Sequence, residues 1–521
     1  MSRGKICVSR KILADVGRGI YRSPASAIKE LVSNSFDAGA GWVRITTNAP
    51  YFDIFTCEDN GAGMTPKEFQ HILHRIGSSS KRSKKTEYVV RAHARRPVIG
   101  KIGIGLLAVS QICDKFAVVS KRKGDRDSFE ATIDLAQFES DDAYLEGEGE
   151  ITLGEYDIST SEVPDDDIPI SYTKIVMTSL REGFRQRLKE EHRLQIARPK
   201  KSPADGRGFE EFAAALAENK DFKSLAEYDR MLWELGLLSP VGYVNSDKAV
   251  FPTPDQLRAD FRRLESFDFR LLFDGMEVRK PILFYRSKNI GRKGIDFKVY
   301  RLPTFSQVIA NERLRFHGYL YSQRVKIRPT ELQGVLVRIR DVGIGAYDKS
   351  LLHYPREEGP IFSMLSGEVF VERGLEGALN IDRNSFNETH PHYLKLQHEL
   401  HRFVKEHVVN DIRARSKARR AKEAGEGLTR FISQLATETK SEWAFGLRFR
   451  VARQSKRQSA PFRYDRSSRT VSLYLKNRGW AKTEKERLVQ IRAVAAHVLM
   501  LELAPRVQPE RILTKLFFGT S

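Results

Sequence analysis

Three short stretches decide the fold: ELVSNSFDAGA at residues 30–40, EDNGAGM at 58–64 and GKIGIG at 100–105. The first belongs to a helical pattern of apolar residues, and the second follows a strand-like run. The third opens the apolar run LLAVSQI, which is typical of a helix start. Each stretch alone has an ordinary structural interpretation, so their order and spacing along the chain carry the functional argument.

The first stretch lies on a helix expected from Pro24 to Ala38, with Ser23 as its N-cap. Glu30, Asn34 and Asp37 fall at i, i+4 and i+7 of this helix and therefore share one face. A carboxylate and a carboxamide one turn apart can activate a water molecule and ligate Mg²⁺, which prefers oxygen ligands. The spacing taken alone also fits a solvated polar face.

The second stretch places Asp59 between a strand and two glycines, Gly61 and Gly63. The glycines allow the backbone to approach a ligand closely. Because an ionised carboxylate only accepts hydrogen bonds, a buried Asp59 suits the exocyclic amine of adenine and repels the carbonyl of guanine. A glycine-rich turn capped by its own Asp and Asn is the structural alternative.

The third stretch sets glycines ahead of a helix start, where free backbone N–H groups suit phosphate oxygens. Gly103, Gly105 and Ala108 also fit the G-x-G-x-x-A dinucleotide fingerprint, but a basic loop precedes them instead of a buried strand. The stretch is not a Walker loop either, because Arg95 stands where the first glycine of that motif belongs.

Composition and charge exclude several classes of protein. The chain has 521 residues, a net charge of +21 and 40% hydrophobic residues, which is typical of a globular protein of about three domains. Three cysteines without a Cys-x-x-Cys pair exclude a disulfide framework, and no apolar run reaches the ~18 residues of a spanning helix. We expect a cytoplasmic protein, for which the basic balance permits nucleic acid as a partner.

In their order and spacing, the three stretches resemble the motifs of the GHKL superfamily. This superfamily includes DNA gyrase B, the ninety-kilodalton heat-shock chaperones, sensor histidine kinases and the mismatch-repair ATPase MutL. GSSSKR at 77–82 resembles the lid segment of the chaperones and of microrchidia-type members, and Thr173 matches the threonine of the closing motif, although Tyr172 replaces the usual preceding glycine. The resemblance covers residues 15–182. A sensor histidine kinase is disfavoured, because those proteins lack the catalytic glutamate.

The resemblance implies a site that binds and hydrolyses ATP with Mg²⁺. It implies Glu30 as the general base, Asn34 as the Mg²⁺ ligand, and Asp59 with Thr173 as the reader of adenine. The other nucleotide-binding positions that carry over from the motifs are Asp37, Gly61, Gly63, Met64, Ser80, Lys81, Gly100, Lys101, Ile102, Gly103, Ile104 and Gly105.

A second resemblance lies further along the chain. LEGALNIDRNSFNE at 375–388 resembles the middle domain of the heat-shock chaperones, where an arginine reaches the γ-phosphate, and this role carries over to Arg383. An arginine there would neutralise charge that develops in phosphoryl transfer. A surface arginine in a capping turn is the structural alternative. GVLVRIRDVGIGAYD at 334–348 resembles prokaryotic microrchidia-like ATPases, and Lys326 is a weaker candidate for a phosphate contact.

We therefore expect an α+β protein. Its parts are an N-terminal two-layer α/β sandwich of the GHKL (Bergerat) type, a second α/β middle (transducer-like) domain and a small α+β C-terminal domain. The expected ranges are 1–182 for the ATP-binding domain with a lid at about 66–100, 183–248 for a helical connector, 249–409 for the middle domain, 410–440 for a charged helical linker and 441–521 for the C-terminal domain. Residues 77–98 are expected to form a loop, and 139–169 a solvated acidic excursion.

The predicted function is that of a slow ATPase and molecular clamp, in which nucleotide binding drives pairing of two N-terminal domains in a homodimer. The first hypothesis for its client is a protein remodelled as by the heat-shock chaperones. The alternative is a DNA- or RNA-binding clamp of the MutL or microrchidia type, in repair or bacterial defence. The segment at 448–469 interleaves Phe and Tyr with Arg, which suggests nucleic-acid contact, although surface strands explain it more simply. An inactive scaffold is disfavoured because Glu30, Asn34 and Asp59 are all present.

Overall fold

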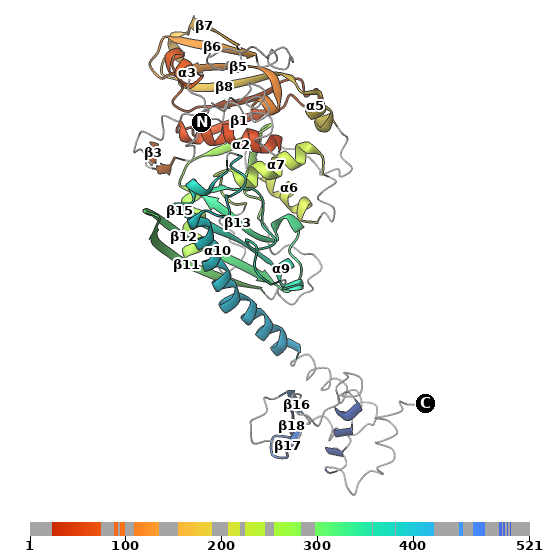
Figure 1. Cartoon of the computed structure of the whole chain (residues 1–521). Helices are drawn as coiled ribbons and strands as arrows, with labels where there is room; N and C mark the ends of the chain where they lie inside the picture. Colours follow the sequence, from red (N-terminus) through yellow and green to blue (C-terminus); the bar gives the residue numbers. More distant parts are fainter. Residues whose placement is uncertain are drawn as a thin grey trace, which may run out of the picture. The chain divides into compact units, whose positions relative to one another are not determined.

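The structure is a computed structural model of the chain. It describes residues 23–73, 88–91, 94–98, 109–134, 155–189, 207–218, 225–244, 255–282, 297–356, 358–380, 382–420, 448–451, 462–474, 489–491, 493–494, 497–498 and 501. The chain divides into two compact units, residues 1–404 and 405–521, each with sheets of its own (Figure 1). The expected α+β class is confirmed. Among the described residues, no helix has the length and apolar character needed to span a membrane.

The first unit opens with an eight-stranded sheet. Its strands are β1 (Trp42–Thr46), β2 (Phe55–Asp59), β5 (Cys113–Lys121), β6 (Asp127–Asp134), β7 (Glu155–Glu162), β8 (Tyr172–Leu180), β9 (Arg270–Phe273) and β10 (Met276–Val278). They lie in the order β10-β9-β1-β2-β8-β5-β6-β7, antiparallel except for the pair β1 and β9. A separate hairpin joins β3 (Tyr88–Arg91) to β4 (Ala94–Pro97).

This sheet differs from the expectation in three places. Strands β9 and β10 come from the range expected for the middle domain, because the chain returns to pair Trp42 with Arg270 in parallel. Strand β7 pairs with β6 over its full length inside the range expected to be a solvated excursion. The β3–β4 hairpin lies inside the range expected to be a loop. In each place the strand is stabilised by pairing with a neighbour, which the local sequence does not reveal.

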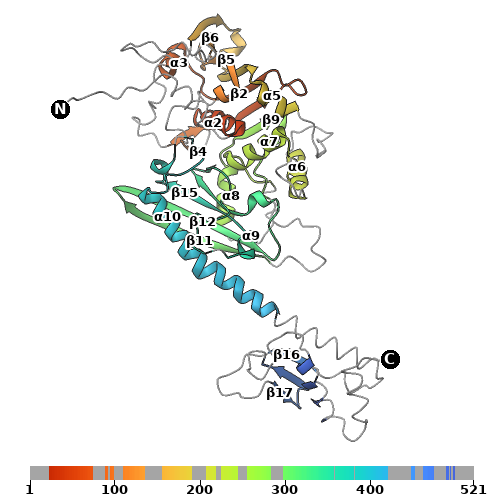
Figure 2. The same cartoon turned by 45° about the vertical axis from the view of Figure 1, so that its right-hand side comes forward.

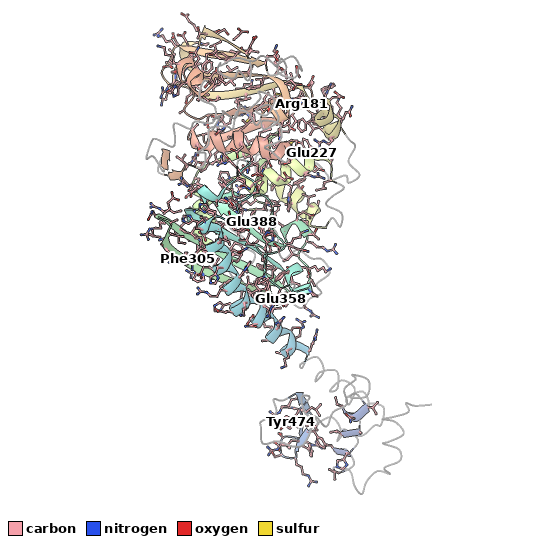
Figure 3. The ribbon with its side chains drawn as sticks, in the orientation of Figure 1. Arg181, Glu227, Phe305, Glu358, Glu388 and Tyr474 are labelled. Carbon is pink, nitrogen blue, oxygen red and sulfur yellow. The ribbon has the colours of Figure 1, made fainter. Side chains whose placement is uncertain are left out.

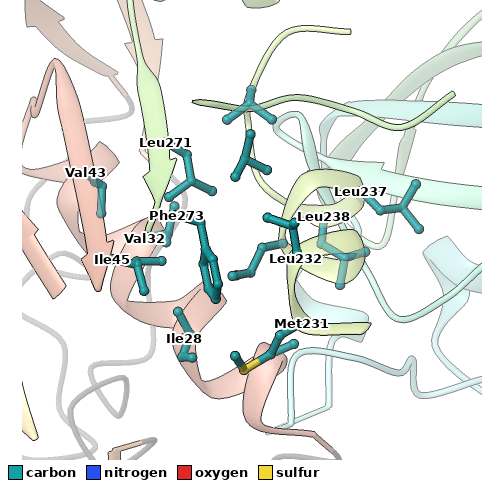
Figure 4. Close-up of a cluster of buried hydrophobic side chains, with 14 of the residues drawn as sticks. Ile28, Val32, Val43, Ile45, Met231, Leu232, Leu237, Leu238, Leu271 and Phe273 are labelled. Atoms are coloured by element: carbon teal, nitrogen blue, oxygen red, sulfur yellow. The ribbon is translucent and has the colours of Figure 1, made fainter. Parts of the chain in front are cut away.

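A helical layer packs on this sheet. It is built mainly from α2 (Pro24–Asp37), α6 (Arg207–Glu218) and α7 (Glu227–Leu238), with α5 (Glu182–Lys189) beside α7 and α3 (Pro66–Leu73) near β6. Ser23 caps α2 by accepting a hydrogen bond from the Ser26 amide at 3.2 Å, and Pro24 occupies the first turn, both as expected. Figure 4 shows the core between the layers, where side chains of β1 and β9 face those of α2 and α7: Ile28, Val32, Val43, Ile45, Met231, Leu232, Leu237, Leu238, Leu271 and Phe273.

A second, five-stranded sheet follows in the same unit, in the order β11-β12-β15-β13-β14. Its strands are β11 (Phe297–Ile309), β12 (Glu312–Gln323), β13 (Gly334–Ile339), β14 (Val342–Gly343) and β15 (Leu365–Arg373). The accompanying helices are α8 (Asp255–Glu265), η7 (Thr330–Leu332), α9 (Pro360–Ser363), η8 (Glu376–Ala378) and α10 (Pro391–Phe403). Both views of the chain show α10 lying along β11 and β12 (Figures 1 and 2).

A buried ion pair within this second sheet also hydrogen-bonds to the end of the helical layer. Arg338 on β13 and Glu368 on β15 are both fully buried and lie 2.5 Å apart. Arg338 donates to the Leu237 carbonyl at the end of α7 at 2.9 Å, and the Tyr243 hydroxyl donates to Glu368 at 2.7 Å. These two hydrogen bonds attach the second sheet to the end of α7. Removal of one partner of the ion pair would leave the other as an uncompensated buried charge.

The second unit contains a helical segment, residues 405–420, which begins in the π-helical turn η9 (Val404–Val409). It also contains a three-stranded sheet of β16 (Arg448–Val451), β17 (Phe462–Asp465) and β18 (Thr470–Leu473), in the order β16-β18-β17. β18 is the central strand, parallel to β16 and antiparallel to β17. Val471 and Leu473 are buried on one face of this sheet.

Candidate functional site

Glu30 and Arg383, the two residues expected to be catalytic, contact each other directly. Nη1 of Arg383 donates a hydrogen bond to Oε2 of Glu30 at 2.7 Å, although the two residues are 353 positions apart in the sequence. Glu30 is 2% exposed and Arg383 is 8% exposed. Neither residue therefore fits its structural alternative, a solvated helix face for Glu30 or a surface arginine for Arg383.

Arg383 lies near the tip of a compact hairpin loop, which we call the Arg383 hairpin and define as residues 378–387. Its ends are joined by a bridge between Leu379 and Phe386 and by a hydrogen bond from the Asn387 amide to the Ala378 carbonyl. Arg383 itself has φ = 50°, in the left-handed region that side chains other than glycine rarely occupy. Such strain persists only where neighbouring contacts hold it.

Lys29 is a second contact between α2 and the hairpin, and the sequence analysis missed it. Its side chain is fully buried, and its Nζ donates to the Asn384 Oδ1 at 3.1 Å. Burial lowers the pKa of Lys29 to about 8, although nearby Glu30 opposes the shift. The neighbouring Glu234 on α7 accepts a hydrogen bond from Ser23, the cap of α2, at 2.9 Å. In the sequence, only its position next to the candidate base Glu30 could have drawn attention to Lys29.

Asp59 lies at the end of β2 and is 6% exposed. Its Oδ2 accepts a hydrogen bond from the Ser35 hydroxyl at 2.7 Å, and its Oδ1 accepts one from the Gly61 amide at 2.8 Å. Burial raises the pKa of Asp59, while these two hydrogen bonds oppose the shift. The hydrogen bond from Gly61 shows that Asp59 also caps the glycine-rich turn, as the structural alternative in the sequence analysis expected. Since a carboxylate has about four acceptor positions, the capped turn leaves acceptor capacity for an amino group.

Thr173, expected to support Asp59, lies directly opposite it across the β2–β8 pair. Residues paired across strands project to the same face, so the two side chains are neighbours. The next strand along adds Ser120, whose hydroxyl lies 3.0 Å from that of Thr173 and accepts a hydrogen bond from the Met64 amide at 3.0 Å. Ser120 therefore joins the expected residues Met64 and Thr173, and no pattern in the sequence singled it out.

Gly61 and Gly63 are both required by close contacts within the chain. A Cβ on Gly61 would lie 2.8 Å from Asp59 Oδ1. A Cβ on Gly63, where φ is 68°, would lie 1.9 Å from the carbonyl oxygen of Lys121. These glycines hold the segment after β2 against Asp59 and the end of β5.

Asn34 and Asp37 differ in exposure although they share the helix face with Glu30. Asn34 is exposed, whereas Asp37 is 8% exposed and makes contacts of its own. An exposed amide oxygen one turn from a buried carboxylate is a donor set that fits Mg²⁺, which keeps several water ligands in such sites. The exposed amide of Asn34 therefore fits the expected Mg²⁺ ligand, and this role stays a prediction.

Several expected positions lie outside the described residues: Ser80, Lys81, Gly100, Lys101, Ile102, Gly103, Ile104 and Gly105. The described segment 94–98 ends two residues before Gly100. Lys326 is exposed in the segment after β12, and the contacts of Glu30 described above do not involve it.

Comparison with known proteins finds similarity in the N-terminal part of the chain. Residues 21–165 match the family described as histidine kinase-, DNA gyrase B- and HSP90-like ATPase. The DNA mismatch repair protein MutL of Rhizorhabdus wittichii is 34% identical over 84 residues, 16% of this chain and 14% of that protein. MutL of Caulobacter vibrioides is 27% identical over 120 residues (23% and 18%), and MutL of Akkermansia muciniphila 28% over 128 residues (24% and 19%).

The chain thus spans less than a fifth of the length of these curated relatives. The matched range contains α2 with Glu30, the turn after β2 with Asp59, and strand β5 with Ser120. Residues 21–165 are therefore similar to the GHKL-type domain of histidine kinase-, DNA gyrase B- and HSP90-like ATPases.

Proposed function

We propose that the chain is a Mg²⁺-dependent ATPase that works as a nucleotide-gated clamp. The observation that carries this proposal is the buried contact between Glu30 and Arg383. It brings together, from residues far apart in the chain, a carboxylate suited to polarise water and a guanidinium suited to neutralise phosphoryl charge. An inactive scaffold has no need of that pairing.

In this proposal Asp59 accepts a hydrogen bond from the exocyclic amine of adenine, with Thr173 and Ser120 beside it. Asn34 supplies an oxygen ligand to Mg²⁺, which would neutralise phosphate charge when bound. Glu30 orients and deprotonates the attacking water. Each role uses a side chain whose position is described above, and none requires the residues outside the described ranges.

Arg383 has two competing partners in this account. A guanidinium 2.7 Å from Glu30 occupies that carboxylate and leaves it less free to orient an attacking water molecule. A γ-phosphate carries more negative charge than one carboxylate and would draw the guanidinium away. Nucleotide binding would thus release Glu30 as a base and place Arg383 on the transferred group. Such dependence on a rearrangement predicts a slow turnover.

The client that we propose is nucleic acid, and the three-stranded sheet of the second unit favours it. Arg450 on β16 and Arg463 on β17 both pair with Ser472 on β18, so they flank it on one face. Arg448 lies two residues before Arg450 and shares that face. All three arginines are exposed, and the described residues provide no ion pair to any of them. We call Arg448, Arg450 and Arg463 the arginine face.

The arginine face is suited to phosphates rather than to bases. Phe462 and Tyr464 alternate with Arg463 along β17, so their rings lie on the opposite face, with buried Val471 and Leu473. Along β17 the interleaving of aromatic residues and arginine is therefore strand alternation, and the rings of Phe462 and Tyr464 provide no stacking surface beside Arg463. Duplex DNA, with its dense phosphate charge, fits this face better than stacked single strands. The similarity to proteins named for DNA mismatch repair supports the same client.

A homodimer with nucleotide-dependent pairing of the N-terminal domains, and a protein client remodelled as by heat-shock chaperones, remain the further hypotheses from the sequence. Aggregation assays distinguish a protein client from a nucleic-acid client. A chain that suppresses aggregation of an unfolded protein and shows no salt-dependent affinity for DNA would favour the chaperone-type client.

The test uses the full chain and measures ATP turnover, nucleotide binding and duplex DNA binding. Glu30→Ala should bind ATP without turnover, and Asp59→Asn should lose binding. Replacing the arginine face by glutamine should reduce the slope of log affinity against log salt by about 2.7, at ~0.9 for each lost phosphate contact. A matched control replaces the exposed Arg126, Arg301 and Arg313 by glutamine. A wild type that binds no ATP refutes the ATPase, and equal effects of both triple variants refute the arginine face.

A further inference from the structure

The turn between β13 and β14 has a strained backbone, and both of its side chains make contacts with other segments. Ile339 pairs with Val342, which leaves a two-residue turn of Arg340 and Asp341. Their φ angles are 50° and 71°, the left-handed conformation of a type I′ turn, in which Asn and Gly are usual. An Arg–Asp pair in such a turn points to side-chain contacts that hold it.

Both side chains of the turn make those contacts. Asp341 lies 2.5 Å from Arg263 on α8. Arg340 is largely buried and binds Glu376 through Nε at 2.9 Å. The same guanidinium donates from Nη1 to the carbonyl oxygen of Val98 at 2.6 Å.

Arg340 therefore links two segments that matter for the site. Glu376 is on η8, immediately before the Arg383 hairpin (Figure 3, where Glu388 marks the chain just after it). Val98 follows β4 and precedes Gly100, the start of the third motif, by two residues. One guanidinium thus holds the base of the Arg383 hairpin and the chain that leads into the expected phosphate-binding stretch.

The Val98 end of this link is itself fixed. Arg96, two residues earlier, is fully buried and donates to the Phe267 carbonyl at 2.7 Å and to the Asp268 carbonyl at 2.9 Å. Its guanidinium also lies 5.1 Å from the ring centre of Phe36 on α2. A displacement of the chain at Val98 would therefore pass to Arg340 rather than be absorbed by a loose segment.

The β13–β14 hairpin also supports the tip of the Arg383 hairpin. Gly345, just after β14, has φ = 68°, and a Cβ there would lie 2.4 Å from the Asn384 carbonyl oxygen. The Arg383 hairpin is thus held at its base through Arg340 and near its tip by Gly345. From α2, Lys29 and Glu30 contact the same tip.

We infer that Arg340 is a positioning residue for ATP hydrolysis: it couples the chain before the third motif to the hairpin that places Arg383 on Glu30. This inference rests on the proposed ATPase function. Arg340 contacts neither Glu30 nor Asp59, so its loss should impair turnover through the position of Arg383 and leave nucleotide affinity nearly unchanged.

The experiment compares Arg340→Ala, Arg340→Lys and the control Arg315→Ala in the full chain. Arg315 makes an exposed pair with Glu372 at 2.7 Å in the same sheet and is therefore matched in chemistry. We expect Arg340→Ala to lower kcat about 10- to 100-fold, with the Kd for a non-hydrolysable ATP analogue changed less than about 3-fold. Arg340→Lys should fall between, because an ammonium cannot reproduce the guanidinium fork to both acceptors. Arg315→Ala should match wild type.

Hydrogen exchange of the nucleotide-free chain supplies a readout that does not need activity. Arg340→Ala should speed exchange at the amides of Asn380, Arg383 and Asn387, which close the hairpin, while Arg315→Ala should not. Unchanged exchange overturns the inference whether or not the chain hydrolyses ATP. Faster exchange with unchanged kcat overturns the role in turnover. A wild type without ATP binding instead overturns the proposed function, and exchange then decides alone whether Arg340 holds the hairpin.

Discussion

Replacing Gly345 by alanine should misplace Arg383 without touching any residue of the site. The added Cβ would lie 2.4 Å from the Asn384 carbonyl oxygen, whereas ordinary contacts begin at 3.4 Å. The hairpin must therefore move by about 1 Å, and a misplacement of that size can reduce a rate by ~100-fold. Asn384 is the neighbour of Arg383, so this displacement acts directly on the 2.7 Å contact with Glu30.

The backbone strain of the substitution needs its own control, because Gly345 has φ = 68°. Gly124→Ala is the matched variant: its φ is 89°, and a Cβ there meets nothing within 4 Å. Both substitutions carry the left-handed penalty of ~1–2 kcal/mol, and only Gly345→Ala moves the hairpin.

The assay measures steady-state ATP turnover, together with analogue binding and the thermal midpoint, for both variants and wild type. We expect both glycine variants to bind the analogue as wild type does and only Gly345→Ala to lose turnover, by about 10- to 100-fold. Equal turnover of the two variants would contradict this prediction, because it would mean that the position of the Arg383 hairpin does not limit hydrolysis.

Three further predictions concern stability. Burial alone would lower the pKa of His317, but hydrogen bonds with Asp260 and Glu372 raise it to about 9. The protonated His317 should therefore stabilise the fold by ~3 kcal/mol below pH 6.5, and this contribution should be lost as the pH rises to 9. In urea unfolding, His317→Gln should lack that decline. The pKa of Lys29 is lowered by burial from 10.5 to about 8, so its contribution should instead rise between pH 8 and 10.5, and Lys29→Met should remove this slope in the same assay. Gly63→Ala should destabilise the chain by at least ~2 kcal/mol in calorimetry, because its Cβ would lie 1.9 Å from a backbone oxygen, whereas Gly183→Ala, in open space, should not.

The sequence predicted the chemical types in the site better than their surroundings. Helix periodicity put Glu30, Asn34 and Asp37 on one face, but it could not tell which of them is exposed. The difference arises because the Arg383 hairpin, some 350 residues away, covers Glu30 and leaves Asn34 exposed. Burial by a distant segment leaves no mark on local spacing.

The same limit explains the residues that the sequence missed. Ser120 lies in no motif, and the resemblance at 334–348, which contains Arg340, did not single that residue out. Each acts through a partner on another strand or loop. Similarly, the four residues of β9 form a strand pattern that fits either sheet, and only the parallel pairing with β1 assigns them to the first. Local pattern gave the strand, and long-range pairing determined its place.

A double-mutant cycle on ATP turnover can show whether Glu30 and Arg383 act together. The four chains are wild type, Glu30→Gln, Arg383→Ala and the double variant, with analogue binding measured for each. We expect both single variants to lose turnover and the double variant to be little slower than Glu30→Gln alone, because the effects of residues that act as a unit are not additive. Fully additive losses, or wild-type turnover in Glu30→Gln, would contradict this expectation.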